Sequence, residues 1–175
     1  MTIRTACNLA VLATIAALPS LSLGQSATLI YGNVNGWTVH TDPNQDYRCY
    51  AEALYEGGSA IRIGFDASSE MYVSIIDSSW SGTVAGEQYE VALQFDEESP
   101  ATFSAVGVAD DAGLSVTVPD GQRAQFREDF ANRYMVSAHH GDHEPVMLSL
   151  GGSFRATLML DECQTLMASV AASSK

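Results

Sequence analysis

The sequence predicts an α+β fold: an antiparallel β-sheet, arranged as a sandwich or an open barrel, with two helices of the C-terminal third packed on it. Two observations predict this class. From Ala27 to Val118 the chain consists of short segments rich in Val, Ile, Tyr, Phe and Thr, separated by Gly, Asp, Asn and Ser. After Pro119 the apolar residues recur at helical spacing instead.

Several of the expected strands alternate between apolar and polar residues. Ile61, Ile63 and Phe65 share one face of their segment, and Arg62 points to the other. One buried face and one wetted face are typical of an antiparallel sheet. The candidate strands of this region are Thr28–Tyr31, Gly36–His40, Tyr47–Tyr55, Ser59–Asp66, Met71–Ile76, Gln88–Phe95, Ala101–Val108 and Leu114–Val118.

Two helices and a hairpin are expected after Pro119. Asp120 can cap the first helix, in which Phe126, Phe130 and Tyr134 recur at four-residue spacing. A hairpin of segments 134–139 and 145–150 follows. The last helix is expected to run from an N-cap at Ser153 to residue 170. Its apolar stripe contains Ala156, Met159, Leu160, Cys163, Met167 and Val170.

Residues 1–24 have the composition of a secretory signal peptide. Arg4 gives a basic start, an apolar stretch of uncharged residues follows, and Pro19 precedes small residues at the expected cleavage point. The apolar stretch is shorter than the roughly 20 residues that span a bilayer. We expect cleavage near Gly24 and Gln25, a periplasmic or secreted location, and a single domain over residues 25–175. A retained N-terminal anchor is the alternative.

The charge balance limits the range of partners. The chain has 8 Lys and Arg against 21 Asp and Glu, and its formal net charge is −13. Such a field repels phosphate backbones, so we expect no nucleic-acid partner and no binding to an anionic membrane surface. The single lysine is Lys175, so a Schiff-base lysine and a P-loop lysine are both excluded.

Cys49 and Cys163 remain after the expected cleavage and are predicted to form a disulfide. An even number of cysteines in a small exported domain most often pairs, because the compartment is oxidising. The chain-entropy model gives roughly 4–5 kcal/mol for a loop of this length. Two free thiols, or two metal ligands, are the alternative.

The segment from His139 to Glu144 is the one local concentration of metal-ligand side chains in the sequence. His140 and His143 flank a Gly-Asp turn, and Asp142 could supply a third ligand for zinc, copper or nickel. The segment has no HExxH spacing. A polar hairpin tip explains the same residues without a metal.

The sequence motifs give little support for a calcium-binding loop or for a catalytic nucleophile. Asp42-Pro-Asn-Gln-Asp46 has the spacing that begins an EF-hand loop, but it lacks the glycine and the acidic residue required further on. No G-x-S-x-G elbow and no S-x-x-K motif is present. His40 could form a catalytic set with a serine that is distant in the sequence, but no local motif indicates such a set. We therefore expect no catalytic residues and no cofactor beyond the possible divalent metal.

The C-terminal part of the chain resembles a known family. A helix and a short strand lead to Val146-Met-Leu-Ser-Leu-Gly-Gly-Ser-Phe-Arg-Ala156 and to a helix that contains Cys163, with Gly36-Trp37 and Cys49 near the expected mature start. These features resemble small exported proteins of Gram-negative bacteria and are similar to the invasion-associated locus B family. Ser153 stands where that family tends to have glycine, and the family's additional cysteines are missing. The resemblance implies a periplasmic or surface β-rich module and brings no catalytic residue.

The sequence therefore predicts a small, acidic, exported and non-catalytic module that binds a protein or a cell-envelope component. Aromatic side chains of the strand region could supply the recognition surface, although core packing accounts for most of them. These aromatic residues are Tyr31, Trp37, Tyr47, Tyr50, Tyr55, Tyr72, Trp80 and Tyr89. The alternative function is a metal-binding protein or metallohydrolase that uses the segment from His139 to Glu144.

Overall fold

Ten strands form one sheet, in which all neighbouring strands are antiparallel, in the computed structural model of the chain. The structure describes residues 28–108 and 112–173. The strand order is β1-β2-β3-β4-β5-β8-β7-β6-β9-β10. Because β1 and β10 are the two ends of this order, the sheet is open. The predicted α+β class and its two C-terminal helices are confirmed. The predicted signal segment lies outside the described residues.

The strands agree closely with the expected ones. They are β1 (Leu29–Val34), β2 (Trp37–Asp42), β3 (Arg48–Leu54), β4 (Ala60–Phe65), β5 (Met71–Ile76), β6 (Gln88–Phe95), β7 (Ala101–Gly107), β8 (Gly113–Thr117), β9 (Met135–His139) and β10 (Val146–Ser149). The helices are α1 (Arg123–Asn132) and α2 (Ser153–Ser173), and short 3-10 turns lie at Pro43–Gln45, Ser78–Trp80 and Asp120–Gln122. None of the described helices is long and apolar enough to cross a membrane.

Three details of the predicted helices were wrong. Asp120 does not cap the first helix: it begins a 3-10 turn, and the N-cap of α1 is Gln122. Helix α1 ends at Asn132, so Tyr134 lies beyond it and is 81% exposed rather than packed with Phe126 and Phe130. Ser153 is the first residue of α2 and not its N-cap. Its side chain is buried and its hydroxyl donates to the backbone carbonyl of Ala131 in α1. The errors at Tyr134 and Ser153 occur where tertiary contacts, rather than local propensity, fix the helix end.

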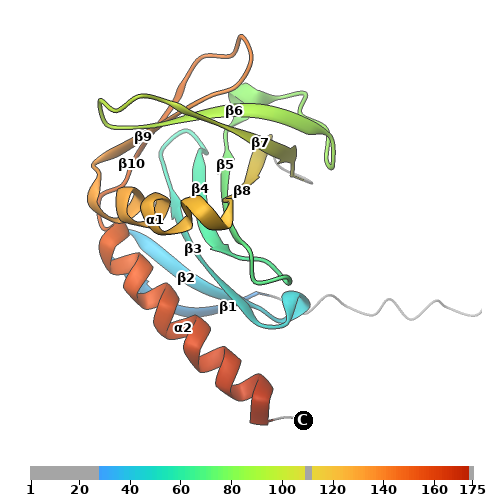
Figure 1. The fold of residues 1–175 in the computed structure, drawn as a ribbon, viewed down its shortest axis with the longest axis vertical. Helices are drawn as coiled ribbons and strands as arrows, with labels where there is room; N and C mark the ends of the chain where they lie inside the picture. Colours follow the sequence, from blue (N-terminus) through green and yellow to red (C-terminus); the bar gives the residue numbers. More distant parts are fainter. Residues whose placement is uncertain (1–27, 109–111, 174–175) are drawn as a thin grey trace, which may run out of the picture.

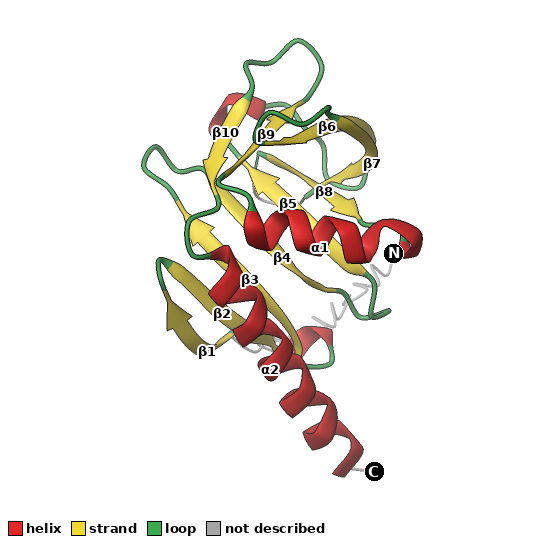
Figure 2. Cartoon of the chain, turned by 60° about the vertical axis from the view of Figure 1, so that its left-hand side comes forward, coloured by secondary structure: helices red, strands yellow, loops and turns green. Residues whose placement is uncertain are grey.

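The sheet bends around α1, and α2 covers its first strands (Figures 1 and 2). Helix α1 lies between the β6–β7 hairpin and α2 (Figure 1). Helix α2 contacts β1, β2 and β3, and it also contacts α1. Its C-terminal half extends past the sheet (Figure 2).

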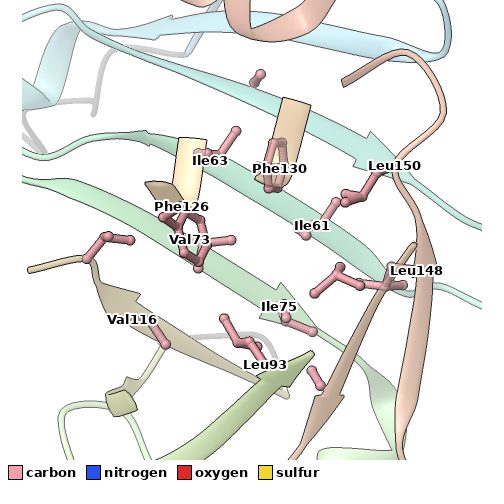
Figure 3. Close-up of a cluster of buried hydrophobic side chains, with 14 of the residues drawn as sticks. Ile61, Ile63, Val73, Ile75, Leu93, Val116, Phe126, Phe130, Leu148 and Leu150 are labelled. Atoms are coloured by element: carbon pink, nitrogen blue, oxygen red, sulfur yellow. The ribbon is translucent and has the colours of Figure 1, made fainter. Parts of the chain in front are cut away.

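The main hydrophobic core lies between α1 and the inner face of the sheet. Phe126 and Phe130 project from α1 toward the aliphatic side chains of β4 and β5, including Ile63 and Val73 (Figure 3). Phe130 also meets the ring of Trp37 edge-on, with centroids 5.6 Å apart. Each Å² of apolar surface that these side chains bury stabilises the folded state by about 25 cal/mol. This burial is therefore the main source of the stability of the fold.

Cys49 and Cys163 are at disulfide-bonding distance, with Cα atoms 6.2 Å apart. Cys49 lies in β3 and Cys163 lies on the buried stripe of α2, as the sequence predicted. The backbone N–H of Cys49 donates to the side-chain oxygen of Gln164 at 3.1 Å. The pair therefore holds α2 against the first half of the sheet.

Candidate binding site on the outer face of the sheet

A cluster of polar and aromatic side chains covers the outer face of β2–β5, the face turned away from α2. In β3 the residues Cys49 and Ala51 point inward, so the alternating residues Tyr50 and Glu52 point outward. The register places His40 of β2 opposite Tyr50. Because all four strands are paired, polar residues that are distant in sequence become neighbours on this face.

Glu52 lies at the centre of this cluster, where its carboxylate is close to two basic side chains. Its carboxylate accepts a hydrogen bond from Nε of Arg62 at 2.5 Å, and Nε2 of His40 lies 3.7 Å from its other oxygen. The side chains of His40 and Glu52 are only 16% and 13% exposed. A paired charge at this depth is held in one geometry, since breaking the pair would leave a half-buried carboxylate without compensation.

One aromatic ring, that of Tyr50, lies against both basic side chains. The imidazole of His40 stacks on the ring of Tyr50, with centroids 4.8 Å apart and planes inclined by 16°. The guanidinium of Arg62 lies over the same ring, 6.0 Å from its centroid. Stacking and cation–π contacts of this kind fix the orientation of the ring at modest energetic benefit.

A cavity of about 310 Å³ opens beside this cluster. Its lining residues are Thr28, Asp42, Gln45, Arg48, Tyr50, Arg62, Phe65 and Tyr72. Gly64 lies between Tyr50 and Tyr72 in the register of the strands. A Cβ atom at Gly64 would approach Cβ of Tyr50 to 2.5 Å, so only glycine allows the close approach of β3 and β4 here.

Burial changes the acid–base properties of the cluster. Desolvation lowers the pKa of His40, the carboxylate of Glu52 opposes that shift, and the charge of Arg62 adds to it. Desolvation also raises the pKa of Tyr50 and that of Tyr72. These tyrosines therefore remain neutral hydrogen-bonding groups at neutral pH.

Two buried nitrogen atoms of this region have no hydrogen-bond partner among the described residues. They are Nε of Arg48, which lines the cavity, and Nε2 of His40 beside it. Buried donors are normally satisfied, because an unpaired one costs about 1–3 kcal/mol. Of these two residues Arg48 lines the cavity, so a ligand bound there would lie close to a side chain with an unsatisfied donor.

The described residues of the cluster can be compared with the arrangement that a nucleophilic catalyst requires. Among the described residues, no hydroxyl or thiol group hydrogen bonds to Nε2 of His40. Elsewhere, Oγ of Ser137 lies 2.9 Å from Nε2 of His139 on strand β9. A catalytic serine needs a base that a third group orients, together with oxyanion donors. His139 has no carboxylate partner in the described part of the chain, so this contact is a surface hydrogen bond.

The predicted metal ligands lie far along the sheet, in the β9–β10 connection. The rings of His140 and His143 stack with centroids 5.4 Å apart, and Nδ1 of His140 lies 3.1 Å from the backbone oxygen of Glu90. Asp142 is exposed. Within residues 28–108 and 112–173, no three His, Cys, Asp or Glu side chains converge to hold a metal ion. The structure thus brings two of the three residues together, and the metal site stays a prediction.

The other residues considered from the sequence have structural roles. Trp37 and Trp80 are buried in the core. Asp42 accepts a hydrogen bond from the backbone N–H of Asn44 at 2.8 Å and so caps the 3-10 turn that follows it. This arrangement is an Asx turn, which explains the calcium-like spacing of the segment.

Sequence reasoning missed Glu52, Arg62 and Arg48 as members of one site. The signal was present in the polar face of the alternating strands, but alternation gives only the face on which a residue lies. Which polar residues become neighbours depends on the register between strands. That register is a property of the folded sheet.

The comparisons with known proteins bear on the fold. No family model matches the chain, and no curated protein matches it. Among solved structures, the invasion-associated protein B from Bartonella henselae superposes with a TM-score of 0.53. The match covers 80% of this chain and 99% of that one, at 13% sequence identity. At that identity the likeness concerns the fold, and it supports the loose resemblance noted in the sequence.

Proposed function

We propose that this protein is an exported, non-catalytic module that binds a sugar unit of a cell-envelope glycan in the pocket on the outer face of β2–β5. The observation that carries the proposal is the composition of that pocket. Tyr50 and Tyr72 supply amphipathic walls, and the lining also contains charged side chains of both signs. This pattern suits an uncharged ligand that is rich in hydroxyl groups, because each polar group can exchange a hydrogen bond without a net charge.

The charges around the pocket and on the whole chain favour a neutral ligand over an anionic one. Arg48 lies opposite Asp42 in the β2–β3 register, and Arg62 forms an ion pair with Glu52. The guanidinium charge of Arg62 is thus paired, and the whole chain carries a formal net charge of −13. An anionic ligand would meet the repulsion of that net charge.

Export is supported by the leader-like composition of residues 1–24 and by the cysteine pair. A disulfide is compatible with an oxidising compartment outside the cytoplasm. Cell fractionation followed by N-terminal sequencing tests this part of the proposal, because the mature chain should begin at Gln25. A cytoplasmic chain that retains residue 1 would contradict it.

Glycan binding is tested by calorimetry with soluble oligosaccharides, namely chitotetraose, maltotetraose and soluble peptidoglycan fragments. At least one should bind, and Tyr50→Ser should weaken that binding at least tenfold, because it removes one aromatic wall. Arg48→Gln should weaken it by a smaller factor while leaving the core intact. Tyr134→Ser is the matched control, since Tyr134 is exposed in the connection between α1 and β9 and does not line this pocket. Absence of binding to all of these sugars would contradict the proposal.

A further inference from the structure

A second cavity lies on the opposite side of the sheet from the outer-face pocket, between α1 and the β6–β7 hairpin. Its volume is about 370 Å³, within the range of small-molecule sites. The sheet contributes Leu93, Phe95, Ala101 and Phe103, the turn between the strands contributes Glu98 and Ser99, and the helical side contributes Gly121, Gln122, Gln125, Phe126 and Asp129. None of these residues belongs to the pocket assigned to the glycan.

The floor of this cavity is aromatic. The ring of Phe126 meets Phe95 and Phe103 edge-on, with centroids 5.4 and 6.0 Å apart. These three rings keep 5–8% of their surface exposed, whereas Phe130, one turn further along α1, is fully buried. All three rings belong to residues that line the cavity. An apolar group placed there would gain contact with three ring surfaces that are already ordered.

The rim of the cavity is polar and carries a net negative charge. Arg133 forms ion pairs with Glu98 and, at 3.5 Å, with Asp129. The side-chain amide of Gln125 donates to both carboxylate oxygens of Asp129, at 3.1 and 3.0 Å. Two carboxylates thus share one guanidinium. An anionic head group would be repelled at this rim, and a neutral or cationic hydrogen-bond donor would be accepted.

From this geometry we propose that the cavity binds a small amphiphile with an apolar body and an uncharged or cationic head group. The apolar body lies on Phe95, Phe103 and Phe126. The head group remains at the rim, beside Gln125 and Glu98. This site is independent of the glycan pocket, because the two lie on opposite faces of the sheet and share no residue.

The test uses the full exported chain with its disulfide formed and the neutral fluorescent probe N-phenyl-1-naphthylamine. Its fluorescence should rise to saturation with one site per chain. Octanol and octylamine should displace it at least tenfold more effectively than octanoate, which has the same chain length and an anionic head. Equal displacement by all three would overturn the assigned head-group chemistry, and absence of saturable binding would overturn the site.

Two neighbouring substitutions in β7 locate the site. Ala101 lines the cavity, whereas Thr102 is exposed on the other face of the same strand. Ala101→Trp should fill the cavity and weaken probe binding at least tenfold, and Thr102→Trp should leave it unchanged. Circular dichroism of both variants confirms that they fold. If folded Ala101→Trp binds the probe like the parent chain, the assignment to this cavity is wrong. Tyr50→Ser should not affect the probe, which separates this site from the glycan pocket.

Discussion

His40 illustrates how the environment of one side chain decides its chemistry. The sequence shows a single histidine in a polar-alternating strand, without a catalytic partner nearby. In the fold its imidazole lies between the ring of Tyr50 and the carboxylate of Glu52. Desolvation is the largest influence on its pKa, so the neutral form is favoured despite the nearby carboxylate.

We predict that His40 titrates below the ordinary histidine pKa of about 6.5. Because an unfolded chain takes up this proton first, the free energy of unfolding should fall as the pH drops from about 6.5 to the pKa of His40 in the folded state. Above that window His40 is neutral in both states and adds no pH dependence. Two-dimensional NMR of the imidazole signals across pH 4–8 measures the pKa.

Arg62→Gln is the diagnostic variant for this prediction. The charge of Arg62 contributes to the lowered pKa of His40, so its removal should raise that pKa. Arg155→Gln is the control, because Arg155 is exposed on α2, away from the β2–β5 outer face. An unchanged His40 pKa in Arg62→Gln would show that the arginine does not act on the imidazole.

At the scale of elements, the connection between β10 and α2 fixes where the last helix lies. Nε1 of Trp37 donates to the backbone oxygen of Gly151 at 3.0 Å. Gly152 has a φ of +89°, and a Cβ atom there would lie 2.5 Å from the backbone oxygen of Asn35. The chain thus turns into α2 while touching the β1–β2 hairpin, and glycine satisfies both the conformation and the space.

We therefore predict that Gly152→Ala lowers the free energy of unfolding by about 1–3 kcal/mol, because it combines a left-handed backbone with a backbone clash. Gly151→Ala should change it by less than about 0.5 kcal/mol, since the nearest atom to a Cβ there is the hydroxyl of Ser149 at 3.4 Å. Urea unfolding of the two variants, measured by the fluorescence of Trp37 and Trp80, compares them. Equal effects would refute the role of Gly152.

At the scale of the whole molecule, the link between Cys49 and Cys163 encloses most of the sheet. The cysteines are 114 residues apart in sequence. In the chain-entropy model a closed loop of that length restricts the unfolded chain enough to add about 5 kcal/mol to the free energy of unfolding. The β3 strand and α2 would otherwise be free to separate early in unfolding.

The double variant Cys49→Ala/Cys163→Ala should lose most of that contribution, with a measurably lower urea midpoint. Reduction of the parent chain should lower the urea midpoint by a similar amount, because reduction and the double substitution remove the same covalent constraint. The reductant should have no effect on the double variant, which serves as the control. If the parent chain unfolds at the same urea concentration with and without reductant, the link does not stabilise the fold.

The sequence determined the local features of this protein. Strand-favouring residues between turn residues identified β5 and β6 to the residue, and β6 also shows period-two alternation. The pairing of Cys49 with Cys163 followed from cysteine number and the expected compartment. The strand predictions succeeded because the face on which a strand residue lies depends on its neighbours in the sequence. The cysteine prediction succeeded because disulfide formation depends on the redox state of the compartment. Where a helix stops was less predictable: α1 ended before Tyr134 because the following residues pair in β9.

Only the tertiary structure decided which polar residues form sites. Glu52 and Arg62 are ten residues apart in sequence, and the β3–β4 register makes them direct partners. The cavity beneath α1 likewise requires β6 and β7 to face a helix that follows them in the chain. Side-chain alternation fixes the face of a strand but not its neighbour, because strand register is set by the packing of the whole sheet. The strands and helices are therefore encoded locally, whereas the two cavities arise only when the sheet is assembled.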